Sequence, residues 1–156
     1  MVRFCVKHSS IIDAPAHDVY KVLADYHHGH AQIMPPQFFD GMTVLKGSGK
    51  GEGTRIEARF SVYGIKDTLI MDVSEPEPGR ILQEIDSKAL NITRFIVDPI
   101  ESRRCHVTIQ THVMKPRGIF PSVDMWFKRI IMTNLYVEEL KMLNQYMQSQ
   151  NKPISS

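Results

Sequence analysis

The sequence predicts an α+β fold in which a run of antiparallel strands precedes one long helix. Apolar and polar residues alternate along most of the chain between residues 42 and 113, and helical spacing replaces this alternation after Pro121. Strands followed by a helix are typical of α+β proteins, whereas a parallel sheet alternates strands with helices. The 156 residues suit a single domain, which we expect to span residues 1–156 with an ordered core at about 3–148.

The chain opens with a strand and a short helical excursion. Residues 3–12 alternate as in a strand. Pro15 then suits the first turn of a helix, and the helical spacing of apolar residues predicts that this helix ends near Tyr26. Residues 27–40 are rich in Gly and Pro, which predicts a loop with one more helical turn at 31–34.

The middle of the chain predicts six further strands, which gives a sheet of six to seven strands in total. We expect them at residues 42–46, 54–62, 69–73, 80–86, 90–97 and 105–113. The sequence Glu-Pro-Glu-Pro-Gly at 75–79 predicts a plain loop. A helix up to about Gln148 follows and is roughly 40 Å long. Because one helix cannot fill the concave side of a large curved sheet, we expect an internal cavity, a place where small molecules bind.

Composition excludes several classes of partner. Lys and Arg total 19 against 17 Asp and Glu, so the net charge of +2 favours neither nucleic acid nor an anionic membrane. Apolar stretches are too short for membrane insertion, and the N-terminal residues do not resemble a signal peptide. We therefore expect a cytoplasmic protein, a monomer or homodimer, whose two cysteines are reduced thiols.

A glycine-rich segment at residues 47–54 invites interpretation as a phosphate-binding loop. A P-loop needs Gly-Lys-Ser/Thr, but Lys50 is followed by Gly51. A dinucleotide fingerprint should lead into a helix, and here a strand is expected. The segment is instead interpreted as a tight hairpin, and no cofactor is predicted.

The histidine-rich segment offers two interpretations. His27, His28 and His30 follow Asp25 and could ligate a metal, but neighbouring side chains in a loop usually diverge, so no metal site is predicted. A solvated loop at the rim of a cavity is the alternative, in which His30 could donate to a ligand or act as an acid or base. The acidic pairs of the chain, including Glu138 and Glu139, are expected to be solvated surface.

Apolar residues on expected inward faces are candidates for the wall of a ligand site, although each of them could equally be ordinary core. Two polar residues, one in the histidine segment and one on the long helix, are candidate contacts to a ligand. The predicted wall consists of Phe60, Leu69, Met71, Phe95, Trp126 and Ile130, with His30 and Asn134 as the polar contacts.

Four segments together resemble a known superfamily. The segments are Ile12-Asp-Ala-Pro15, the helix ending Val-Leu-Ala-Asp25, Gly49-Lys-Gly-Glu-Gly-Thr54 and Glu75-Pro-Glu-Pro-Gly-Arg80, and a long terminal helix follows them. In this order they resemble the START-related and birch-pollen-allergen superfamily (SRPBCC). Within it, the resemblance is to the polyketide cyclase/dehydrase branch. One departure is that Tyr26 and the histidines stand where the family often has Trp.

The resemblance implies a helix-grip fold, a curved antiparallel sheet wrapped around the C-terminal helix, with a deep apolar cavity. It implies binding or transport of a small hydrophobic molecule such as a lipid or polyketide. The alternative it implies is a polyketide cyclase or dehydratase with His30 as acid/base at the cavity mouth. Because fold does not fix chemistry, no catalytic residue is transferred from the family.

Overall fold

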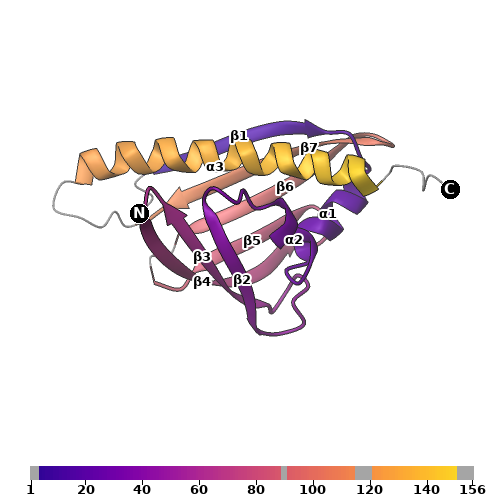
Figure 1. Cartoon of the computed structure of the whole chain (residues 1–156). Coiled ribbons are helices and arrows are strands. Elements are labelled where there is room, and N and C mark those ends of the chain that lie inside the picture. The colour runs from indigo at the N-terminus through magenta and orange to yellow at the C-terminus, as the bar shows by residue number, and fades with distance from the viewer. Residues whose placement is uncertain (1–3, 89–90, 115–120, 151–156) are drawn as a thin grey trace.

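The structure, a computed structural model, contains one seven-stranded antiparallel sheet (Figure 1). It describes residues 4–88, 91–114 and 121–150, with side chains of the last range described from residue 126. In spatial order the strands are β1, β7, β6, β5, β4, β3 and β2. Their bounds are β1 Phe4–Ile12, β2 Phe39–Lys46, β3 Arg55–Val62, β4 Ile65–Glu77, β5 Ile81–Asp86, β6 Ile92–Glu101 and β7 Arg104–Val113.

Three helices complete the described fold. The helices α1 (Ala16–Ala24) and α2 (Gly29–Ile33) follow β1, and α3 (Pro121–Gln150) is the last element of the chain. In Figure 1, α3 runs along the sheet beside β1, while α1 and α2 lie near the C-terminal end of α3. This arrangement confirms the predicted α+β class and its helix-grip architecture.

The prediction of a loop at residues 75–79 is wrong for residues 75–77, which belong to β4. β4 continues to Glu77, and Glu77 pairs with Ile81 across a turn whose Gly79 has a φ of +84°. The register between β4 and β5 shifts between Ser74 and Glu77. A bulge of this kind relieves Pro76 of a regular ladder bond, which is why proline is tolerated inside the strand.

Other predicted boundaries differ by a few residues. α1 ends at Ala24, two residues before the expected end, because the chain after it turns to meet the glycine-rich segment. The second half of β4 agrees with the prediction, but the strand begins earlier than expected, at Ile65. Leu90, the expected start of a strand, lies outside the described residues, and β6 begins at Ile92.

The hydrophobic core lies between one face of the sheet and the helices. Along β3, Ile56 and Ala58 are fully buried on the predicted inward parity, and β7 buries Val107 and Ile109 in the same way. Val19 and Leu23 on α1 face this core, as their spacing predicts. The two cysteines are free thiols, and Cys105 is buried within the core.

The glycine-rich segment is the connection between β2 and β3, as expected, and it braces the end of α1. Gly49 accepts a hydrogen bond from the Tyr26 backbone N–H at 2.8 Å, and the Gly51 N–H donates to the Ala24 carbonyl at 2.9 Å. Gly47 has a φ of +84°, and a Cβ there would lie 2.5 Å from the Gly53 carbonyl oxygen. Glycine is therefore required for a turn that fixes where Tyr26 enters the core.

Candidate ligand cavity

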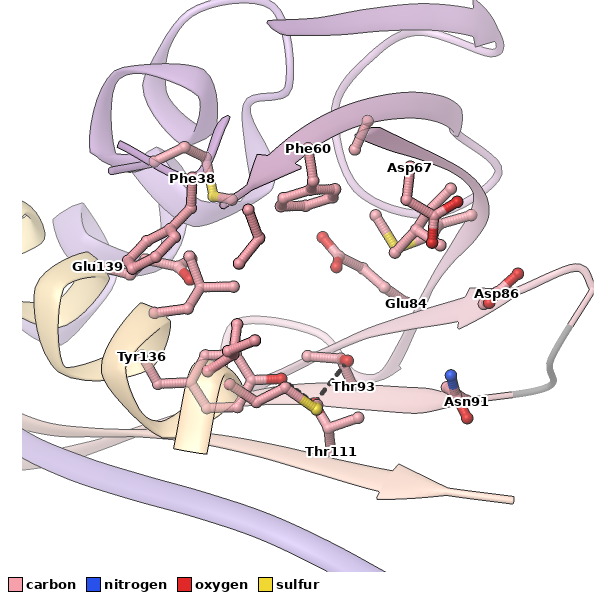
Figure 2. A pocket seen from close by; sticks show the side chains of 18 of the residues that line it. Phe38, Phe60, Asp67, Glu84, Asp86, Asn91, Thr93, Thr111, Tyr136 and Glu139 are labelled. Atoms are coloured by element: carbon pink, nitrogen blue, oxygen red, sulfur yellow. Dashed lines mark hydrogen bonds between the residues drawn. The ribbon is translucent and has the colours of Figure 1, made fainter. Parts of the chain in front are cut away.

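A cavity of about 320 Å³ lies between the inner face of the sheet and α3. Most of its wall is apolar and comes from strands far apart in the sequence. Figure 2 shows these side chains converging from the sheet and α3. The main apolar contributors are Met34, Phe60, Leu69, Met71, Phe95 and Leu135.

Three ionisable side chains form a buried polar group at one end of this cavity. His30 and Glu139 are each 2% exposed, and Glu84 is 5% exposed. They come from α2, α3 and β5, and all three line the cavity. Buried polar groups need hydrogen-bond partners, so each one must be accounted for.

The Glu84 carboxylate is held by a tyrosine. The Tyr26 hydroxyl donates to Glu84 Oε1 at 2.7 Å. Burial and the neighbouring Glu84 raise the pKa of Tyr26 well above its usual value, so this phenol keeps its proton and remains a donor. Because the glycine-rich segment fixes the backbone of Tyr26, it also determines where this hydroxyl meets Glu84.

His30 has a fixed tautomer and a fixed ring orientation. Its Nδ1 lies 2.7 Å from the Leu23 carbonyl oxygen, which can only accept, so Nδ1 carries a proton. The ring stacks on Tyr26 at 4.8 Å between centroids and meets Phe95 edge-on at 5.1 Å. In the neutral ring, Nε2 is therefore an acceptor, and it lies on the side of the two glutamates.

Close packing of α1 and α2 places His30. A Cβ on Gly29 would lie 2.5 Å from the Val22 carbonyl oxygen, so only glycine permits this approach of the two helices. His30 follows immediately, and its backbone N–H donates to the Asp25 carbonyl at 2.8 Å. The imidazole thus enters the core directly after the close contact between α1 and α2.

Glu139 is the least satisfied member of the group. Among the described residues, its buried Oε1 has no hydrogen-bond partner. The distance from His30 Nε2 is 3.7 Å to Glu139 Oε1 and 3.9 Å to Glu84 Oε1, both too long for a hydrogen bond. Burial, with a smaller contribution from the charge of Glu84, raises the pKa of Glu139 well above its usual value. Glu139 therefore favours the neutral acid, which can donate a proton.

A second polar strip, made of hydroxyl groups, runs along the cavity wall. The hydroxyls of Thr93 and Thr111 lie 2.8 Å apart, and the Tyr136 hydroxyl bonds to that of Thr111. Burial raises the pKa of Tyr136, so its phenol is neutral. Figure 2 places these three residues between the Glu139 end and the end that carries Asp86 and Asn91. The cavity is therefore mostly apolar, with polar groups at both ends and the hydroxyl strip between them.

The structure brings five of the predicted site residues together at the cavity. His30, Phe60, Leu69, Met71 and Phe95 all line it. The sheet residues among them follow the alternation from which they were predicted.

The three predicted residues on the last helix lie elsewhere. Trp126 is 65% exposed, Ile130 is 40% exposed and Asn134 is exposed too, so their expected inward placement is wrong. Apolar residues occur on two sides of α3, and at about 3.6 residues per turn these three share the side opposite the cavity. The inward side carries Ile131, Met132, Leu135, Tyr136 and Glu139.

Two acidic members of the polar group are not predicted by the sequence. Glu139 was expected to be solvated surface, which is wrong because it lies on the same side of α3 as Leu135. Glu84 shares the inward parity of Leu82 along β5, and that parity was the available signal. Tyr26 was predicted only as the end of a helix.

The other histidines of the segment diverge, as expected for neighbours in a loop. The His28 side chain is 81% exposed, and His27 Nε2 lies 3.0 Å from the Ser48 carbonyl oxygen on the glycine-rich segment. Within the described ranges, no group of His, Cys, Asp and Glu could hold a metal ion. None of the described helices is long and apolar enough to cross a membrane.

Solved structures similar to this chain share its fold over nearly the full length. A START superfamily protein from Mycobacterium smegmatis is 14% identical, with a TM-score of 0.71 over 94% of this chain and 99% of that chain. The Zhui aromatase/cyclase from a Streptomyces species is 16% identical, with a TM-score of 0.78 over 98% of each chain. The di-domain aromatase/cyclase BexL is 20% identical, with a TM-score of 0.70 over 96% of this chain and 48% of that one.

These likenesses confirm the START-like fold that the sequence motifs predicted. No protein-family model and no curated protein matches the chain at a significant level. At such low identity the structural neighbours define the fold, and they do not define the chemistry of this chain.

Proposed function

We propose that this protein binds or transports a small hydrophobic molecule, of lipid or polyketide type, in the cavity between the sheet and α3. The observation that carries the proposal is the cavity itself. At about 320 Å³ it falls within the range of small-molecule sites, and its wall is mostly apolar. Phe60, Leu69, Met71 and Phe95 are proposed as apolar contacts, with His30 as a polar one.

The proposal predicts that filling the cavity abolishes binding. Leu69→Trp adds bulk to the wall, whereas Leu45→Trp adds the same indole at a position that is 49% exposed on β2 and outside the cavity. Fluorescence titration with the neutral dye N-phenyl-naphthylamine should show binding to the wild type and to Leu45→Trp, and a large loss in Leu69→Trp. Equal binding by the two variants, with both still folded by circular dichroism, would place the dye elsewhere and contradict the proposal.

Native mass spectrometry of protein purified from its own host can identify the ligand. A co-purifying hydrophobic molecule that is absent from the Leu69→Trp preparation would support a cavity-bound ligand. A cytoplasmic location and a monomeric or homodimeric state remain predictions, and the same spectra report the oligomeric state.

A second candidate function is favoured by the polar end of the cavity. His30 Nε2 can accept a proton and the neutral Glu139 can donate one, and the distance between His30 Nε2 and Glu139 Oε1 is 3.7 Å. In a dehydration, the base would take a proton from carbon while the acid protonates the departing hydroxyl, which leaves as water. Two of the structural neighbours are described as aromatase/cyclases. Unchanged turnover of a hydroxylated polyketide substrate by His30→Ala would remove this candidate.

A further inference from the structure

The buried acid Glu139 is an unpaired polar group that faces a ligand-sized cavity. It is 2% exposed, and its Oε1 has no hydrogen-bond partner among the described residues. Leaving a buried polar group unpaired is unfavourable, so such groups are rarely retained without a partner. Neighbouring inward positions on α3 carry apolar side chains such as Leu135 and Leu140. The missing partner is therefore expected to come from what occupies the cavity.

His30 presents the opposite hydrogen-bonding character at the same place. Because Nδ1 donates to the Leu23 carbonyl, the neutral ring offers Nε2 only as an acceptor. The nearest carboxyl oxygens lie 3.7 and 3.9 Å away, so Nε2 is not hydrogen-bonded to either of them. Stacking on Tyr26 and the edge contact with Phe95 keep the ring in this orientation. One donor and one acceptor thus stand side by side at the end of an apolar cavity.

We propose that the ligand of this cavity carries a hydroxyl group that accepts a hydrogen bond from the Glu139 carboxyl group and donates one to Nε2 of His30. This inference rests on the proposed binding function and specifies its ligand class: an apolar molecule with an alcohol or phenol at one end. The raised pKa of Glu139 supports the donor role, because burial and the charge of Glu84 both favour its neutral form.

Other polar groups satisfy the pair less well. A ketone or an ether accepts from Glu139 but leaves the His30 nitrogen without a donor. An ammonium group only donates, so it would need an ionised Glu139 as its acceptor, whereas burial and the charge of Glu84 favour the neutral acid. A ligand carboxylate would bring negative charge beside the buried Glu84, which already takes its hydrogen bond from Tyr26. A hydroxyl is the simplest group that both accepts and donates.

Matched probes test this inference. β-Naphthol and β-methoxynaphthalene share an apolar ring system, and both can accept a hydrogen bond, but only the naphthol can donate one. Displacement of N-phenyl-naphthylamine should show that the wild type prefers the naphthol by about tenfold, as expected when one acceptor in a buried site is left unpaired. Glu138→Gln, a change at the neighbouring residue outside the cavity, should keep this preference.

Two variants at Glu139 sharpen the test. Glu139→Leu removes the donor that both probes use, so it should weaken the binding of the naphthol and of the ether by a similar factor while the preference for the naphthol, which depends on His30, is kept. Folding should not be lost, because an apolar residue suits the buried position. Glu139→Gln keeps a neutral donor on its amide nitrogen and should retain the wild-type affinity for both probes.

The outcomes separate the two proposals. If the wild type binds both probes equally, or if Glu139→Leu binds both probes as tightly as the wild type, the hydroxyl inference is overturned while the binding function stands. If the wild type binds neither the probes nor the dye, the proposed function fails and the inference fails with it. The comparison within the wild type needs no variant, so a misfolded variant does not weaken it.

Discussion

Replacing Glu139 by glutamine should remove one source of pH dependence from the stability of the fold. Glu139 in the folded protein holds its proton to a higher pH than in the unfolded chain, because it is buried beside Glu84. Between the unfolded and the folded pKa, the native state therefore binds more protons than the unfolded state. Stability contributed by this group is fully present below the unfolded pKa of about 4.3 and is lost as the pH rises through the folded pKa.

The size of the effect follows from proton linkage. One proton bound only by the native state changes the free energy of unfolding by about 1.4 kcal/mol per pH unit. The amide introduced by Glu139→Gln cannot ionise, so the stability of the variant relative to the wild type should increase by about this slope until the pH reaches the folded pKa. The groups facing Glu139, namely Glu84, His30, Tyr26 and Tyr136, are present in both proteins.

Urea unfolding at several pH values between about 5 and 8 measures this difference. Glu138→Gln serves as the matched control, because it makes the same chemical change at the neighbouring residue, which is not buried. A stability difference between Glu139→Gln and wild type that stays constant over the whole range would show that Glu139 ionises as it does in the unfolded chain. Glu139 would then not be the neutral, donating acid that its burial predicts.

Further predictions concern the supports of the cavity. Tyr26→Phe should lower the free energy of unfolding by about 1–3 kcal/mol, because Glu84 loses its buried donor, and an unchanged urea midpoint would contradict this. Gly47→Ala should lower the melting temperature more than Gly53→Ala does. Both glycines have a positive φ, but only at position 47 would a Cβ clash with backbone atoms. Equal melting temperatures of the two variants would contradict this clash. Burial raises the pKa of Cys105 to about 11, so a thiol reagent at a pH of about 8 should modify it only after unfolding. Because Cys5 is also a free thiol, peptide mapping has to locate the label, and rapid labelling of Cys105 in the native protein would refute the prediction.

Strand placement could be predicted because the period of two is a local signal. Ile56 and Ala58 alternate with charged residues, and the inward face of β3 follows from that alternation alone. The stretch around Glu75 misled because its prolines and glycine carry a turn signal, while the bulge that accommodates Pro76 depends on the neighbouring strand β5. The pairing of strands is a tertiary property that a single segment does not encode.

The polar end of the cavity was only partly predictable for a different reason. Glu84 and Glu139 are of a residue type that is almost always solvated, so treating them as surface is sound until their neighbours are known. On α3, Trp126 and Ile130 are as apolar as Met132 and Leu135, and the sequence alone offers no way to choose between the two sides. His30 could be singled out, but its tautomer depends on the Leu23 carbonyl, which the packing of α1 against α2 provides.

The order of strands has a consequence for how the chain assembles. From β2 to β7 each strand pairs with its neighbour along the chain, but β1 pairs only with β7, so that Ile12 lies opposite Cys105. Synthesis at about 5–20 residues per second leaves the first strand waiting for several seconds before its partner exists. α3, which packs against β1, is made later still. Pairing β1 with β7 thus joins segments that are separated by five other strands in the sequence, and contacts of such long sequence separation slow folding. The cavity is then complete only when the last helix has docked beside the first strand.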